Sequence, residues 1–178
     1  MHRLPEPSLN RSSQLSPLKF SVEESDPQGP EALALLREAA REVQLLYPEF
    51  HDPTAPPPTN TPTQPRGAYF VAFAAGRPVG MGAHRPLDEE TTEVRRMFVT
   101  RDVRSRGVAR IILEHVEAHA LAHGFQRAVL ETGCRQLPAM HLYESCGYTR
   151  VPAFGVYAND PTSVCYAKRL VASVRLEA

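Results

Sequence analysis

The order of hydrophobic patterns between residues 68 and 132 constrains the fold more than any other feature of the sequence. Three short runs typical of strands, separated by short links, are followed by an amphipathic segment of helical period and then by a short, almost wholly apolar run. Short links favour antiparallel neighbours, whereas a strand reached across a helix is usually parallel and buried. The sequence therefore predicts a mixed sheet rather than a repeated β-α-β unit.

The same patterns place the other elements. Alternation of apolar and polar residues indicates strands, and apolar residues spaced three and four apart indicate helices. Helices are expected over residues 31–46, 107–123 and 137–145. Strands are expected over residues 18–25, 68–75, 79–84, 93–99, 128–132, 148–151 and 163–170. The predicted fold class is an α/β, three-layer (α+β) sandwich, whose mixed, mostly antiparallel sheet of about six or seven strands carries helices on both faces.

Composition limits the number of domains and the kinds of partner. The 178 residues favour one domain over residues 18–178, preceded by a poorly ordered leader over residues 1–17. Twenty basic and twenty acidic residues give zero net charge, which argues against a nucleic acid or an anionic membrane as partner. Three cysteines without a CxxC pair favour a reducing compartment, so we expect a cytoplasmic protein. Six prolines make residues 51–66 a long loop.

The stretch Met97–Arg110 carries the clearest chemical signal. It reads as the end of a strand, an arginine-rich turn and the start of an amphipathic helix. A helix N-terminus leaves about four backbone N–H groups unpaired and favours negative charge, and Gly107 would let an anion approach them closely. The stretch therefore predicts a phosphate-bearing ligand, although an arginine-rich turn can also be merely solvated. It has neither the GxxxxGK[ST] nor the GxGxxG pattern.

Two segments resemble the GNAT superfamily of acetyl-CoA-dependent N-acetyltransferases. Arg104-x-x-Gly107-x-Ala109 is similar to its [RQ]-x-x-G-x-[GA] pyrophosphate loop, and about 30 residues later Ala139-Met-His-Leu-Tyr143-Glu-Ser-Cys-Gly147-Tyr148 is similar to its A-x-x-L-Y-E-x-x-G-F/Y segment. The likeness covers about residues 68–170. The stretch Leu130-Glu-Thr-Gly with Gln136 further resembles a bacterial subgroup that acts on small molecules, although many members carry Asn at the position of Gln136.

The resemblance implies a splay between the fourth and fifth strands, with the pantetheine arm along one of them and the pyrophosphate at the helix N-terminus. Acetyl-CoA would be the acyl donor, without a metal, and the acceptor a primary amine of a small molecule or amino acid. Homodimers are frequent in this family. The implied coenzyme-binding residues are Met97, Phe98, Val99, Arg104, Ser105, Arg106, Gly107, Val108, Ala109, Arg110, Gln136 and Tyr143.

Two residues are implied to take part in the chemistry. Tyr143 matches the family's general acid for the departing thiolate, whereas its alternative role is a core aromatic of the short helix. Glu93 lies on the strand that leads to the loop and is the candidate base, directly or through water. Its alternative role is a pair with Arg95, which a strand places on the same face.

Other interpretations stay open at this stage. The protein could bind coenzyme A without turnover, or it could be a nucleic-acid-binding module whose arginines, at positions 95, 96, 101, 104, 106 and 110, grip phosphates. His115, His119 and His123 recur at helical spacing but are interpreted as packing and edge residues rather than metal ligands. Cys134 follows the fifth strand, and an acyl-cysteine role is the less favoured interpretation of it.

Overall fold

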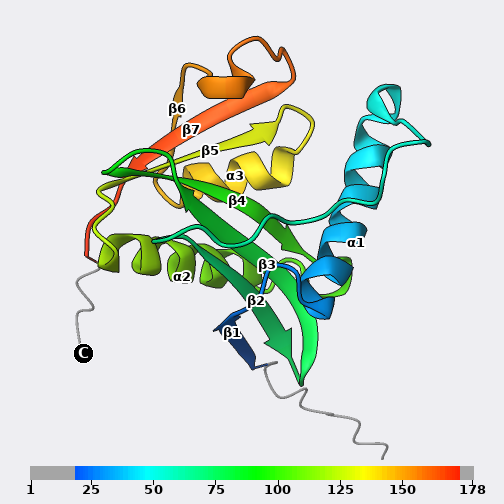
Figure 1. The fold of residues 1–178 in the computed structure, drawn as a ribbon, viewed down its shortest axis with the longest axis horizontal. Helices are drawn as coiled ribbons and strands as arrows, with labels where there is room; N and C mark the ends of the chain where they lie inside the picture. The colour runs from blue at the N-terminus through cyan, green and yellow to red at the C-terminus, as the bar shows by residue number, and fades with distance from the viewer. Residues whose placement is uncertain (1–18, 173–178) are drawn as a thin grey trace, which may run out of the picture.

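The computed structural model describes residues 19–172, so the predicted leader over residues 1–17 lies outside the described residues. The described chain forms a seven-stranded sheet with the strand order β1-β2-β3-β4-β5-β7-β6 (Figure 1). Its strands are β1 (Phe20–Glu24), β2 (Ala68–Ala74), β3 (Arg77–Pro86), β4 (Thr91–Val99), β5 (Arg127–Gly133), β6 (Thr149–Val151) and β7 (Ser163–Arg169). Its helices are α1 (Pro30–Leu46), α2 (Val108–Ala122) and α3 (Leu137–Ser145), with short 3-10 turns η1 (Pro48–Phe50), η2 (Arg101–Val103) and η3 (Gly155–Tyr157).

The predicted fold class is confirmed, and each predicted helix and strand is present with ends shifted by a few residues. Only β4 and β5 pair in parallel, and every other neighbouring pair is antiparallel. The largest shift is in β3, which we expected over residues 79–84 but which runs from Arg77 to Pro86. Proline cannot donate a hydrogen bond to a sheet. The sequence pattern therefore predicted a strand that lies between Pro78 and Pro86 and excludes both. The sheet accommodates Pro78 beside a register shift at Ala72/Phe73.

The helices lie in two layers on opposite faces of the sheet. One face and α1 share a small core that contains Leu35, Tyr69 and Met81. The other face and α2 share the larger core, to which α3 adds Tyr143. Figure 1 shows α1 apart from α2 and α3, with the sheet between them. In the part of the chain that the structure describes, no helix has the length and apolar character needed to cross a membrane.

The parallel pair β4–β5 separates part of the way along its length. Its register runs from Thr91↔Arg127 to Val94↔Leu130 and then ends, although β4 continues to Val99 and β5 to Gly133 (Figure 1). The second half of β4 therefore has a partner on the β3 side only. This is the splay that the family resemblance implied, and it leaves backbone groups of both strands available to a ligand.

Gly82 lets α2 approach the sheet beneath this opening. A Cβ atom at Gly82 would lie 2.5 Å from Ile112 Cγ2 and 2.7 Å from Met97 Sδ. Real Cβ atoms do not approach other atoms so closely, so this position requires glycine. Gly80 has the same role, since a Cβ atom there would lie 2.8 Å from Ile112 Cδ1.

A histidine pair joins β3 to α2 on the larger core. His84 is buried, its Nδ1 lies 2.8 Å from Thr92 Oγ1, and its Nε2 lies 2.9 Å from His119 Nδ1. His119 in turn stacks on His123 at 3.9 Å between ring centroids. Burial, followed by the charges of His119 and His123, lowers the pKa of His84 to about 4. Packing and edge roles for the helix histidines therefore match the geometry.

Acidification should destabilise the fold through His84. Its folded-state pKa of about 4 lies below the ordinary 6.5, so the unfolded chain binds more protons between these values and stability falls as the pH drops from about 6.5 to 4. At about 1.4 kcal/mol per pKa unit, the loss reaches about 3 kcal/mol. His84→Gln should flatten the pH dependence of the urea-unfolding free energy across this window, whereas His115→Gln, at an exposed position, should leave it unchanged. Equal slopes for wild type and His84→Gln would contradict the assignment.

Candidate active site

The N-terminus of α2 presents backbone donors without protein acceptors. Among the described residues, the N–H groups of residues 105–110 donate to no carbonyl, and no side chain caps the helix. Ser105 and Gly107 have φ values of 62° and 81°, whereas Arg106 between them does not have a positive φ. Such alternation curls the backbone and gathers N–H groups into an anion-binding concavity. Nothing lies within 4 Å of a Cβ built on Gly107, so the concavity is open.

Several arginine side chains of this loop bond to the protein itself, rather than all pointing toward a ligand as the sequence suggested. Arg104 is tied into the protein: its Nε donates to the Val99 carbonyl at 2.8 Å and its Nη2 to Glu42 Oε2 at 2.8 Å. Arg101 donates to the other oxygen of Glu42 at 3.1 Å. Arg110 donates to Ser145 at 2.9 Å. The backbone N–H groups of residues 105–110 therefore supply most of the free donors at this helix N-terminus, which we call the phosphate seat. Arg104 makes the adjoining turn more rigid.

Met97, Phe98 and Val99 form the edge of β4 that faces the splay. Phe98 and Val99 pair with Met81 and Gly80 of β3 on their other side. Met97 packs against the core under α2, whereas Phe98 packs against the core under α1. The edge of β4 toward β5 is thus unpaired, which suits strand-like binding of an amide-containing chain.

Tyr143 lies in the core. The residue is 5% exposed, and its ring packs on Tyr148 and Tyr166 at centroid distances of 5.8 and 6.1 Å. Within the described chain its hydroxyl has no hydrogen-bond partner, so it is not engaged elsewhere in the core. Burial, followed by the negative charge of Glu131, raises the pKa of Tyr143.

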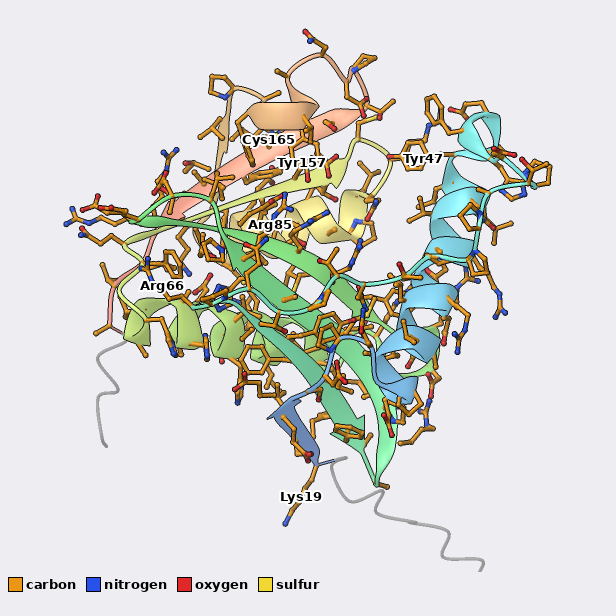
Figure 2. The ribbon with its side chains drawn as sticks, viewed as in Figure 1. Lys19, Tyr47, Arg66, Arg85, Tyr157 and Cys165 are labelled. Carbon is orange, nitrogen blue, oxygen red and sulfur yellow. The ribbon has the colours of Figure 1, made fainter. Side chains whose placement is uncertain are left out.

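Glu93 is the centre of a buried polar cluster. It is 1% exposed; its Oε2 accepts from Arg85 Nε at 2.7 Å and its Oε1 from the Tyr157 hydroxyl at 2.7 Å. Arg95 Nε lies 3.8 Å from Oε1. Burial and the hydrogen bond to Glu93 raise the pKa of Tyr157 to about 12, so the phenol stays a donor. Figure 2 shows Arg85 and Tyr157 near each other, from β3 and from the segment before β7.

The alternative interpretation of Glu93, a pair with Arg95, is therefore present in the structure, and Arg85 is the closer partner. A carboxylate so engaged does not touch open space directly. Any proton that it takes from an acceptor would have to pass through a rearranged side chain or a relay.

A cleft of about 420 Å³ lies between the end of α1 and the far ends of β5 and β7. The hydroxyl of Tyr47 accepts a hydrogen bond from the backbone N–H of Arg135 at 2.8 Å, which joins the two walls (Figure 2). Gln136, the N-cap residue of α3, also lines the cleft. Other residues of the lining are Val43, Tyr47, Phe50, Glu131 and Gly133.

Glu131 was not among the predicted site residues, yet it lines this cleft just beyond the last position of β5 that pairs with β4. It is half-buried, and its Oε1 accepts from Ser163 Oγ at 2.7 Å. Burial, followed by the nearby charges of Asp160 and Glu93, raises its pKa. The position of Glu131 within an otherwise apolar strand could have marked it in the sequence as a candidate site residue. No comparable feature of the sequence marked Arg85.

Cys134 is exposed beside the cleft wall and all three cysteines are free. No histidine hydrogen bonds with Cys134 in the described structure, so nothing there resembles an activated thiol nucleophile. Cys165 is buried and Cys146 half-buried, as packing residues.

A strand splay beside a helix N-terminus with free donors defines the class of acyl-CoA-dependent acyltransferases, and comparisons with known proteins agree. The acetyltransferase (GNAT) family model matches residues 35–148. An IAA acetyltransferase of Azospirillum brasilense is 32% identical over 84% of this chain and 97% of its own length. The N-acetylaspartate synthetase of Rattus norvegicus is 32% identical over 80% of this chain but only 49% of its own length.

Among solved structures, a Klebsiella pneumoniae protein superposes with a TM-score of 0.70 and 26% identity, covering 85% of this chain and 98% of that one. The chain belongs to the acetyltransferase (GNAT) family. It is accordingly an acyltransferase that transfers an acetyl group from acetyl-CoA.

Proposed function

We propose that this protein transfers the acetyl group of acetyl-CoA to a primary amine of a small molecule or amino acid, by direct attack within a ternary complex. The observation that carries the proposal is the run of free N–H groups at residues 105–110, which opens beside the splay of β4 and β5. The name of one relative, N-acetylaspartate synthetase, supports the proposal, since N-acetylaspartate is an N-acetylated amino acid.

Different residues along the splay would bind different parts of acetyl-CoA. The diphosphate of the donor would bind the N–H groups of residues 105–110, and the pantetheine amides the free edge of Met97–Val99. The amine nitrogen then attacks the acetyl carbonyl carbon, the carbon–sulfur bond breaks, the amine loses a proton and the thiolate gains one. Holding both reactants in this geometry supplies several kcal/mol or more of the rate enhancement.

Tyr143 would serve the departing thiolate. Its raised pKa keeps the phenol protonated at neutral pH, and makes complete proton release less favourable than hydrogen-bond donation. We therefore assign it the stabilisation of the thiolate through its free hydroxyl, with the proton following as the thiol leaves.

Two carboxylates could take the proton of the amine. Glu93 would act through a relay that includes Tyr157, because its own oxygens are buried and engaged. Glu131 lines the cleft, and its raised pKa brings it closer to the neutral range where a base is most effective. The two can be separated by their pH profiles.

The phosphate seat is tested by a pair of glycine variants with the same backbone conformation. Gly107 and Gly76 both have φ near +80°, and nothing lies within 4 Å of a Cβ at either. Gly107→Ala should weaken CoA binding roughly tenfold or more, a loss of about 1.4 kcal/mol, because the new Cβ and the strained backbone disturb the donors. Gly76→Ala should destabilise the fold by about 1 kcal/mol without changing the Kd. Calorimetric titration with CoA decides, and an unchanged Kd in Gly107→Ala would overturn the seat.

Tyr143→Phe should lower kcat roughly 100-fold, the lower end for general acid catalysis, a much larger factor than any change in the Kd of CoA. Tyr148→Phe is the matched control, because its hydroxyl is buried without a partner and its loss should not affect the rate. The measurement is release of free thiol from acetyl-CoA with the best amine of a panel. Equal rates for wild type and Tyr143→Phe would remove the role, and CoA binding without thiol release for any amine would indicate a protein that binds but does not turn over.

Glu93→Gln should lower kcat/KM more at pH 7 than at pH 9.5, where the free amine is plentiful and a base matters less. Glu131→Gln, measured in parallel, should show the same pH-dependent deficit if Glu131 is the proton acceptor. Circular dichroism must first show both variants folded, since removing one partner of a buried ion pair destabilises. A loss that is equal at every pH would exclude a role as base for the residue concerned.

A further inference from the structure

We propose that the acceptor carries a carboxylate in addition to its amine, and that Arg95 and Arg96 at the bulge of β4 bind this carboxylate. The inference rests on the proposed function and names the substrate class of the same site, an amino acid or similar amine-bearing acid. It assigns an anion-binding role to a pair of arginines on the sheet, separate from the phosphate seat.

A bulge in β4 places the side chains of Arg95 and Arg96 on one face of the sheet. Between β3 and β4 the register goes from Met81↔Phe98 to Ala83↔Arg95, so β4 holds one extra residue there. Arg96 has a φ of 60°, in the left-handed region. A bulge re-aims side chains that would otherwise alternate between faces.

Contacts identify this face as the one under α1. Arg95 lies across from Ala83, which lies across from Tyr69, and directly paired residues share a face. Arg96 Nε donates to Asn60 Oδ1 at 2.9 Å, and Asn60 Nδ2 donates to the Tyr69 hydroxyl at 3.3 Å. Both arginines therefore lie on the Tyr69 side of the sheet, beside the Glu93 cluster.

The charge balance of this face leaves one guanidinium group without an ionic partner. The buried carboxylate of Glu93 is held by Arg85 Nε at 2.7 Å, and Arg95 Nε lies 3.8 Å from its other oxygen, which also accepts from Tyr157. Arg96 hydrogen bonds only to the neutral Asn60 in the described structure. Among the described residues, the positive charge of Arg96 therefore has no close negative partner, and Arg95 shares the single carboxylate of Glu93 with Arg85.

These guanidinium groups also interact with one another. Desolvation, followed by the positive charge of Arg95, lowers the pKa of Arg96, and Arg85 adds a smaller contribution of the same sign. Neighbouring like charges of this kind are relieved when an anion binds between them. A planar guanidinium pairs best with a planar carboxylate, to which it can donate two parallel hydrogen bonds.

The charges around the arginines restrict which anion can bind there. Arg95 and Glu131 are the residues that follow the last β4–β5 pair, Val94↔Leu130, so Arg95 lies at the start of the same splay as the Glu131 that lines the cleft. Glu131 and Asp160 make that neighbourhood unfavourable for a doubly charged phosphate. An amine group suits the Glu131 side, and a single carboxylate suits the arginine side.

Asn60 explains why the arginine is available. It is 5% exposed and comes from the proline-rich segment 51–66; its Nδ2 also donates to the Pro27 carbonyl at 2.8 Å. Gln28 Nε2 donates to the Asn60 carbonyl at 3.2 Å. The segment thus holds Arg96 through a neutral acceptor, which orients the guanidinium without neutralising it. Asn60 is a positioning residue in this scheme.

The test compares matched acceptors on the full-length protein. Each amino acid is paired with its carboxamide, its decarboxylated amine and its aminophosphonate analogue, and thiol release from acetyl-CoA is followed. Binding of the same compounds to the protein saturated with CoA is measured by calorimetry. We expect at least one amino acid to be acetylated, with kcat/KM about 100-fold or more above that of its carboxamide, as for sites built around a polar group.

Arg96→Gln should raise KM for the amino acid about tenfold or more, by loss of a charged partner, and should lower kcat/KM for the neutral carboxamide by a much smaller factor. Arg96→Lys should recover part of the loss, since it restores charge but not the planar fork. Arg37→Gln, on the exposed side of α1, should change neither substrate. If Arg96 had a purely structural role, its replacement would lower kcat/KM for the amino acid and for the carboxamide by the same factor.

Three results would overturn the proposal: equal use of acids and carboxamides, preference for the aminophosphonate, or neither binding nor turnover of any carboxylate-bearing amine by protein that binds CoA. Failure to bind CoA at all would instead overturn the proposed function, so the two failures are distinguishable.

Discussion

The end of hydrogen bonding between β4 and β5 after Val94 and Leu130 is the constraint on which the site depends. A parallel pair that continued to Val99 would use the backbone groups of Met97–Val99 within the sheet and would leave no room for a ligand. Because the strands separate, the same backbone groups become donors and acceptors for a substrate. The N-terminus of α2 follows β4 after a short turn, so the free N–H groups of residues 105–110 fall at one end of the opening.

The separation is held by packing and charge rather than by the strands themselves. Under one face, Gly82 lets Ile112 and Met97 meet the sheet closely, which fixes α2 beneath the opening. On the other face, the buried carboxylate of Glu93 joins β3 and β4 to Tyr157 of the segment before β7. A buried charge is costly unless it is paired and hydrogen-bonded. The cluster therefore ties the two halves of the sheet on either side of the splay.

Local patterns allowed much of this to be predicted from the sequence. The free helix N-terminus at Gly107 could be inferred because its signal, a glycine between an arginine-rich turn and an amphipathic helix, lies within a few consecutive residues. The partners of Glu93 could not, since Tyr157 lies 64 positions away and no local pattern pairs it with Glu93. The bulge at Arg96 was also hidden, because the left-handed residue is an arginine rather than a glycine. Glu131 had a signal, a charge within an apolar strand, whose meaning depended on where the strand pairing ends.

The coupling between the donor and acceptor sides follows from one carboxylate. Glu42 of α1 receives Arg101 on one oxygen and Arg104 on the other, at 3.1 and 2.8 Å, and Arg104 also holds the Val99 carbonyl at the end of β4. Exposed ion pairs of this kind contribute little to stability, typically about 0–1 kcal/mol. Their value here is geometric, because α1 carries Val43 and leads into Tyr47, both of which line the cleft, while the arginines lie in the turn before the free N–H groups of residues 105–110. The helix that bounds the cleft is thereby set in a fixed relation to the loop that we propose binds the donor.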